Sequence, residues 1–90
     1  MRKTDLANLL IAKFLEQAPH DLREIQTGLE NEDAGRIISA AHRLKGSAAN
    51  ISAELLRQSA AQIETCARQG ALAEARACLL QLRGLMPPLA

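Results

Sequence analysis

Residues 37–51 read IISAAHRLKGSAANI, and this stretch decides the fold. Its apolar positions recur at alternating steps of four and three residues: Ile37, Ala41, Leu44, Ala48 and Ile51. That spacing is typical of the inward stripe of a helix in a bundle. The stretch therefore predicts an amphipathic helix that packs against other helices.

The composition of the whole chain also favours helices. The 90 residues suit one domain, 48% of them are hydrophobic, and Phe14 is the only aromatic residue. A core made of Leu, Ile and Ala is more typical of helices than of sheets. We therefore expect a single all-α domain.

Helical periodicity and boundary residues divide the chain into five expected helices. We expect them at about residues 4–17, 20–29, 32–50, 53–69 and 71–84, with a frayed tail at 86–90. Pro19 is expected to end the first helix, Ser52 to cap the fourth, and Gly70 to stop it. Because the connections are short, we predict an antiparallel four-helix bundle with an additional short N-terminal helix.

His42 lies opposite the apolar stripe of the helix predicted around it. At about 100° per residue it falls about 140° from the centre of that stripe, so its imidazole should face solvent. Charged residues are usual at exposed helix positions, but small or apolar residues share the face of His42. They are Ile38, Ser39, Gly46 and Ala49. Gly46 costs about 1 kcal/mol against alanine inside a helix and so needs a reason. We interpret this surface as one kept clear for a partner protein.

Basic side chains accompany this face. Lys45 lies one turn from His42 on the same side of the helix, where its cation could meet an anionic group at the ring. Three arginines add positive charge near this face: Arg36, Arg43 and Arg57. Glu54 is the only close acid that we expect. Such a charge gradient would attract an acidic pocket. Each residue alone could be an ordinary surface residue, and only their combination favours a site.

A carboxylate on the next helix is expected to hold the ring. Antiparallel pairing places Glu64 opposite His42, where a hydrogen bond to Nδ1–H would leave Nε2 as a free nucleophile. The alternative is that Glu64 pairs with Arg68, four residues further along the same helix. The spacing leaves both interpretations open.

The segment AHRLKGSAANI, residues 41–51, resembles the signature of the histidine phosphotransfer (Hpt) family, His-x-x-Lys-Gly followed by small residues. The resemblance extends over nearly the whole chain. It implies that His42 is the phosphoacceptor and that Glu64 holds its ring. It also implies that Lys45 and Gly46 contact the phosphoryl group and admit the partner. The chain departs from the family at Ser52, where glycine is frequent; because serine is a good N-cap, we expect little consequence.

The family's role implies a carrier that takes a phosphoryl group from the phospho-aspartate of one receiver domain and passes it to another. The expected docking face for the receiver is Ile38, Ser39, Arg43, Ala49 and Arg57. Glycine-rich nucleotide loops, Walker patterns and metal-binding acid clusters are missing from the sequence. We therefore expect no kinase site, metal or cofactor in this chain, and Mg²⁺ in the receiver. The alternatives are a phosphorylation-independent helical adaptor and an enzyme such as a phosphohistidine phosphatase.

Charge, hydropathy and cysteine usage limit the setting. A net charge of +1 and a single aromatic residue argue against nucleic acid binding. No apolar run approaches the about 20 residues that a membrane span needs. We expect a cytoplasmic monomer, either free-standing or, as we favour, the C-terminal module of a hybrid sensor histidine kinase. Cys66 and Cys78 lack a zinc pattern and are expected to be buried and reduced, with a bridge or redox role as the alternative.

Overall fold

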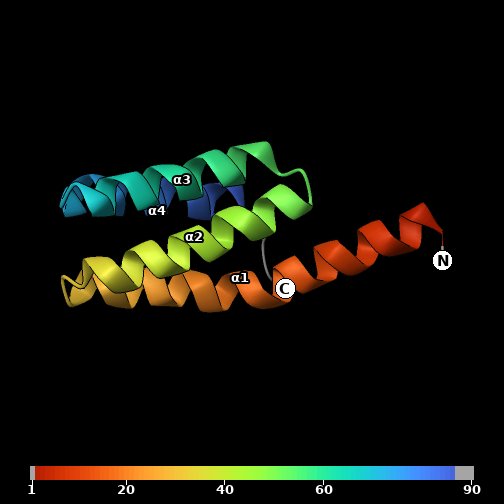
Figure 1. The fold of residues 1–90 in the computed structure, drawn as a ribbon, viewed down its shortest axis with the longest axis horizontal. Helices are drawn as coiled ribbons and strands as arrows, with labels where there is room; N and C mark the ends of the chain where they lie inside the picture. The colour runs from red at the N-terminus through yellow and green to blue at the C-terminus, as the bar shows by residue number, and fades with distance from the viewer. Residues whose placement is uncertain (1, 87–90) are drawn as a thin grey trace.

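The structure, a computed structural model, describes residues 2–86. The helices run in the order α1 (Lys3–Glu30), α2 (Ala34–Asn50), α3 (Glu54–Arg68) and α4 (Leu72–Leu85), and neighbours along the chain are antiparallel (Figure 1). No strand occurs within residues 2–86. The prediction of an all-α antiparallel bundle is confirmed, and α2, α3 and α4 begin and end within two residues of their predicted ranges. The frayed tail predicted for 86–90 lies outside the described residues, apart from Met86.

The predicted break at Pro19 is wrong, because α1 runs through this residue as one helix. Proline removes one backbone hydrogen bond and usually kinks or ends a helix. Here the apolar buried positions on both sides of it stay in phase on one face: Phe14, Ala18, Leu22, Ile25 and Leu29. Burial of this stripe outweighs the lost bond, since each large apolar side chain contributes about 1.5–3 kcal/mol. The additional N-terminal helix is therefore the first half of α1.

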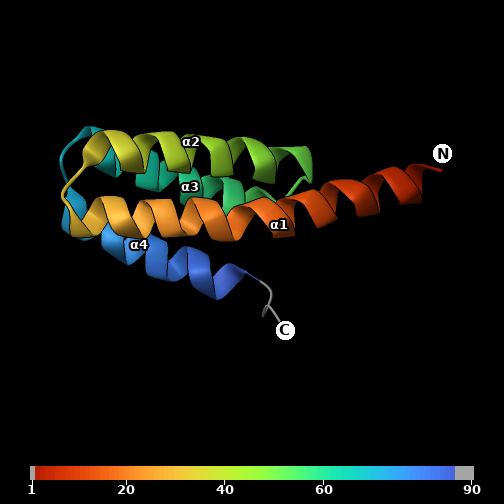
Figure 2. The ribbon, with the colours of Figure 1, turned by 90° about the horizontal axis from the view of Figure 1, so that it is seen from below.

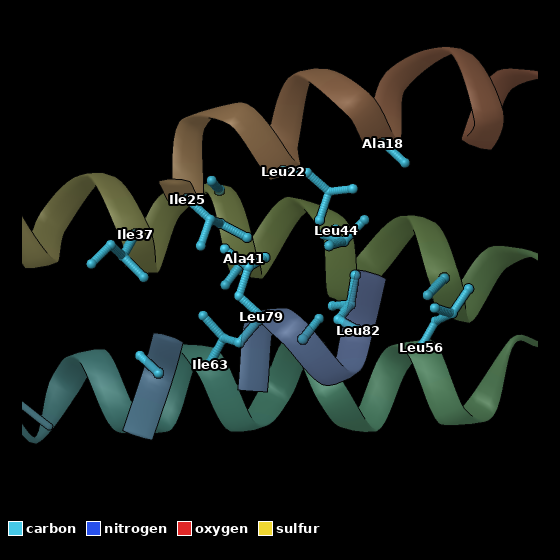
Figure 3. Packing of buried hydrophobic residues seen from close by; sticks show 14 of the residues in the cluster. Ala18, Leu22, Ile25, Ile37, Ala41, Leu44, Leu56, Ile63, Leu79 and Leu82 are labelled. Atoms are coloured by element: carbon cyan, nitrogen blue, oxygen red, sulfur yellow. The ribbon is translucent and has the colours of Figure 1, made fainter. Parts of the chain in front are cut away.

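The core lies between the four helices, and each helix contributes to it (Figure 3). Its largest fully buried apolar side chains are Ile25, Leu29, Ile37, Leu44, Ile63, Leu79 and Leu82. The stripe predicted for residues 37–51 is the core face of α2, with Ile51 half-buried at its end. Helix α2 packs closely against both α1 and α3, whereas α4 packs mainly against α3. The opposite face of α2 is consequently held firmly and presented to solvent.

The first part of α1 extends beyond the ends of the other helices, as Figure 2 shows. Its side chains Leu6, Leu9 and Ile11 are exposed. The molecule is consequently elongated, with extents of 44 × 24 × 19 Å. Even so, none of the helices within residues 2–86 is long and apolar enough to cross a membrane.

The turn between α2 and α3 differs from the prediction at Ser52. The N-cap of α3 is Ala53, which makes no side-chain capping hydrogen bond. Ser52 instead has a φ of 56°, in the left-handed region that favours glycine. The N-cap role expected for Ser52 is therefore wrong, and this serine strains the backbone at the turn.

Ser52→Gly should stabilise the fold by about 1 kcal/mol, because the left-handed region costs an L-residue about 1–2 kcal/mol. The midpoint of thermal unfolding should rise by about 4–8 °C. The matched reverse change is Gly70→Ala, at the corresponding position after α3 with a φ of 72°, and it should lower the midpoint. An unchanged or lower midpoint for Ser52→Gly would contradict the assignment of strain.

Candidate functional site

His42 lies midway along α2 and points away from the core, with 67% of its side chain exposed. Ala41 and Leu44, its close neighbours in sequence, are fully buried. The packing of α2 thus fixes the base of the imidazole side chain while leaving the ring open to solvent. This is the orientation that the position of His42 on the helix predicts.

Glu64 reaches the ring from α3 and forms the centre of the site. Its side chain is 9% exposed, and its Oε2 lies 3.5 Å from Nδ1 of His42. Lys45 Nζ donates a hydrogen bond to Oε1 at 2.8 Å, and Arg68 Nη2 donates one to Oε2 at 2.9 Å. The expected partnership with His42 and the alternative pair with Arg68 therefore coexist on one carboxylate.

The contact between His42 and Glu64 differs from the predicted hydrogen bond in its length. N–H···O hydrogen bonds usually measure about 2.7–3.2 Å, so 3.5 Å is an electrostatic contact rather than a full hydrogen bond. Both carboxylate oxygens already accept hydrogen bonds from the two cations. The ring must therefore share Glu64 with Lys45 and Arg68.

The cations around Glu64 keep it ionised. The hydrogen bond from Lys45 is the main cause that lowers the pKa of Glu64 from 4.5 to about 2. Burial opposes this change, and the hydrogen bond from Arg68 lowers the pKa further. Glu64 is therefore a carboxylate at neutral pH, beside a ring that would become positively charged when it attacks an electrophile.

Glu64→Gln should remove a pH-dependent part of the stability. Because the folded pKa lies below the value of 4.5, ionised Glu64 stabilises the fold above about pH 4.5, and this contribution is lost as the pH falls towards 2. Its partners are partly exposed, so solvent screening limits the contribution to about 1–2 kcal/mol.

Urea unfolding of both proteins at about pH 7 and about pH 3 measures this contribution. The variant should be less stable than the wild type at neutral pH, and the difference should shrink at low pH. The other carboxylates cancel in the comparison because both proteins contain them. A difference that stays constant between the two pH values would contradict the low pKa of Glu64.

Lys45 and Gly46 lie beside the ring, but in different situations. Lys45 is engaged by Glu64 and is 31% exposed, so it would have to leave this carboxylate to contact a phosphoryl group. Gly46 is exposed, and a Cβ added to it would meet no described atom within 4 Å. At Gly28, by contrast, an added Cβ would lie 2.7 Å from Cγ1 of Ile37. Internal packing therefore requires glycine at position 28 and does not require it at position 46.

An open surface hollow adjoins the ring and is lined by Ile38, Ser39, His42 and Arg68. Ile38 is half-buried, whereas Ser39 and Ala49 are exposed. Of the small and apolar residues predicted for this face, Ile38 and Ser39 line the hollow beside His42. Arg57 is more distant, because it lies two helical turns along α3 from Glu64.

The predicted excess of positive charge around the face is wrong. Each of the three arginines pairs with a carboxylate: Arg36 with Glu24 at 2.6 Å, Arg43 with Asp21 at 3.1 Å, and Arg57 with Glu54 at 2.9 Å. Glu54 is therefore one of several close acids, two of which come from α1. Paired opposite charges largely cancel at a distance, so long-range attraction of an acidic partner should be weak.

Comparison with known proteins shows the family to which this chain belongs. A family model described as Hpt domain matches residues 9–89, which include every residue gathered around His42. The chain belongs to the Hpt domain family. Hpt domains have a histidine phosphotransfer role in phosphorelays, where they interact with receiver domains as phosphocarriers rather than kinases. No curated protein and no solved structure matched the chain.

Two residues at the site of this Hpt domain were not predicted as parts of it. Arg68 lines the hollow beside His42, and the signal for it was its position four residues after Glu64. Asp21 is fully buried in α1, where its Oδ1 accepts the hydrogen bond from Arg43. Its Oδ2 has no partner among the described residues. The signal for Asp21 was an acid inside the apolar stripe of α1.

Metal-binding groups do not gather at this site. Within the part of the Hpt domain that the structure describes, no cluster of three or more His, Cys, Asp or Glu side chains could hold a metal ion. The groups that lie beside the His42 imidazole are the Glu64 carboxylate and the two cations that share it.

Proposed function

We propose that this Hpt domain accepts a phosphoryl group from the phospho-aspartate of a receiver domain onto Nε2 of His42 and passes it to another receiver domain. The observation that carries the proposal is an imidazole that is 67% exposed while its Nδ1 lies 3.5 Å from the Glu64 carboxylate. A carboxylate beside Nδ1 favours the tautomer with the proton on that nitrogen, so Nε2 keeps a free lone pair. The nucleophile is thus oriented before the partner arrives.

The transfer step follows from this arrangement. Nε2 forms a bond to phosphorus as the bond between phosphorus and the aspartyl oxygen breaks, and the aspartate leaves as a carboxylate. The ring gains positive charge, which the adjacent Glu64 carboxylate stabilises. The receiver domain supplies the Mg²⁺ and most of the phosphoryl-binding groups, while this chain supplies a positioned nucleophile.

Lys45 and Arg68 give the site a way to respond to the new phosphoryl group. Both hold Glu64 before transfer, at 2.8 and 2.9 Å. When the ring becomes positive, its Nδ1–H competes for Oε2 of Glu64, and the phosphoryl oxygens attract the two cations. We assign Lys45, together with Arg68, to the support of the phosphoryl group and Glu64 to the support of the ring.

The receiver should dock over the exposed face of α2. Gly46 and Ala49 offer little bulk there, and Ile38 and Ser39 line the hollow beside the ring. Arg43 and Arg57 would form the rim of the docking face and exchange their present ion pairs for contacts with the receiver. A monomeric state and a place as the C-terminal module of a cytoplasmic hybrid kinase stay predictions.

Incubation with a radiolabelled phosphorylated receiver domain tests the proposal. The label should move to this chain in a form that is labile in acid and stable in base, as expected for a phosphorus–nitrogen bond. A phosphate on aspartate or serine would show a different stability. A chain that binds the receiver but never takes the label would favour the helical adaptor instead.

A further inference from the structure

Cys66 of α3 and Cys78 of α4 lie on the facing sides of two packed helices. Both are free, and both are half-buried where the sequence predicted burial. They line the same open hollow, together with Gln62 and Glu74. The Sγ of Cys78 donates a weak hydrogen bond to Oε1 of Gln62 at 3.8 Å, and Gln62 precedes Cys66 by one turn of α3. The Cys78 thiol therefore rests on the face of α3 that carries Cys66.

The two cysteines lie on the walls of one hollow between the packed helices α3 and α4. Burial raises the pKa of the Cys78 thiol, and the nearby Cys66 thiol raises it further. These are the only cysteines of the chain. A short turn, with Gly70 in the left-handed region at φ 72°, fixes the pairing of the two helices on which they lie. The fold thus holds its only two thiols together at a place that solvent can reach.

We propose that Cys66 and Cys78 are a redox site, at which a peroxide forms a reversible intramolecular disulfide that clamps α4 to α3. One thiolate attacks the peroxide, becomes a sulfenic acid and releases water in the case of hydrogen peroxide. The second thiol then attacks the sulfenic sulfur and expels another water. In total the two thiols lose two protons and two electrons, and hydrogen peroxide is reduced to two waters.

The disulfide would form on the side of α3 away from the phosphotransfer site. Residues two apart in a helix point about 200° apart, so Cys66 and Glu64 face nearly opposite directions. The bridge would therefore leave Glu64 beside His42. It would act on α4, which packs mainly against α3 and little against α1. The inference concerns a second site and does not depend on phosphoryl transfer.

Treatment of the full chain with hydrogen peroxide tests the inference. We expect a mass loss of about 2 Da, a cross-linked peptide pair containing Cys66 and Cys78, and a monomer on a non-reducing gel. The midpoint of thermal unfolding should rise by on the order of 10 °C, because the bridge closes a short loop in the unfolded chain. Dithiothreitol should reverse all of these changes.

A matched control keeps two thiols but turns one away. In the double variant Cys78→Ser with Ala77→Cys, the thiol moves about 100° round α4 to an exposed position. This variant should form no internal bridge and gain no stability from peroxide, and Cys66→Ser should behave in the same way. The proposal is overturned if the wild type gives sulfinic acids or cross-linked dimers instead, or bridges no better than the double variant.

Discussion

His42→Gln should reduce phosphoryl uptake from a phosphorylated receiver to background, whereas His20→Gln should leave it unchanged. Glutamine preserves a polar side chain on the helix but has no imidazole nitrogen with a nucleophilic lone pair. His20 is a close control, because its side chain is 52% exposed and lies 3.9 Å from Glu24. The two histidines differ in their place in the fold, since only His42 adjoins Gly46 and the carboxylate that Lys45 and Arg68 share.

Transfer of radiolabel to each variant, read after fixed times, measures this prediction. Circular dichroism should show that both variants remain helical, because both side chains are largely exposed. Retention of the label by His42→Gln would refute the carrier proposal. Loss of the label only in His20→Gln would move the phosphoacceptor to α1.

Gly46→Leu should lower kcat/KM for phosphoryl transfer at least about tenfold while the isolated domain becomes no less stable. Nothing described lies within 4 Å of an added Cβ at this position, so the free fold has room for the side chain. Leucine also favours a helix over glycine by about 0.8–1 kcal/mol. In the complex, the added bulk would lie within one turn of the reacting ring. Overpacking there costs about 1–3 kcal/mol, and 1.4 kcal/mol corresponds to about tenfold.

Two further glycine variants separate docking from stability. Gly46→Ala adds a single methyl group and should stabilise the fold with a smaller loss of transfer. Gly28→Ala should destabilise the fold, because its Cβ would lie 2.7 Å from Ile37, yet Gly28 lies in α1 and away from the docking face. Thermal unfolding and transfer kinetics on all three variants provide the comparison. Normal transfer by Gly46→Leu would show that the receiver docks elsewhere.

Local patterns were sufficient to predict most of the fold. The alternating steps of Ile37, Ala41, Leu44 and Ala48 correctly predicted the core face of α2, because a helix repeats its faces at a period that the sequence must match. Gly70 correctly marked the end of α3, because only glycine adopts a left-handed backbone without strain. The predictions for Pro19 and Ser52 were wrong because both relied on local preference alone. Their local preferences were overridden by burial of the α1 stripe and by the geometry of the turn.

The sequence likewise predicted some features of the candidate site and missed others. The exposure of His42 and its proximity to Glu64 could be predicted, because the first depends on the period of one helix and the second on antiparallel pairing of two. The ion pairs of Arg36 and Arg43 with α1 could not, because they depend on how α1 lies against α2. The prediction of an excess of positive charge around His42 was wrong for this reason.

The sequence by itself determined the helical class, the core face of α2 and the solvent-facing position of His42, since these follow from the period of the α-helix. Only the tertiary structure decided how the charges are shared. Glu64 divides its two oxygens among Lys45, Arg68 and the ring, and Asp21 is buried against Arg43. The physical reason is that a side-chain ion pair between helices depends on their spacing and rotation, which no single stretch of sequence specifies.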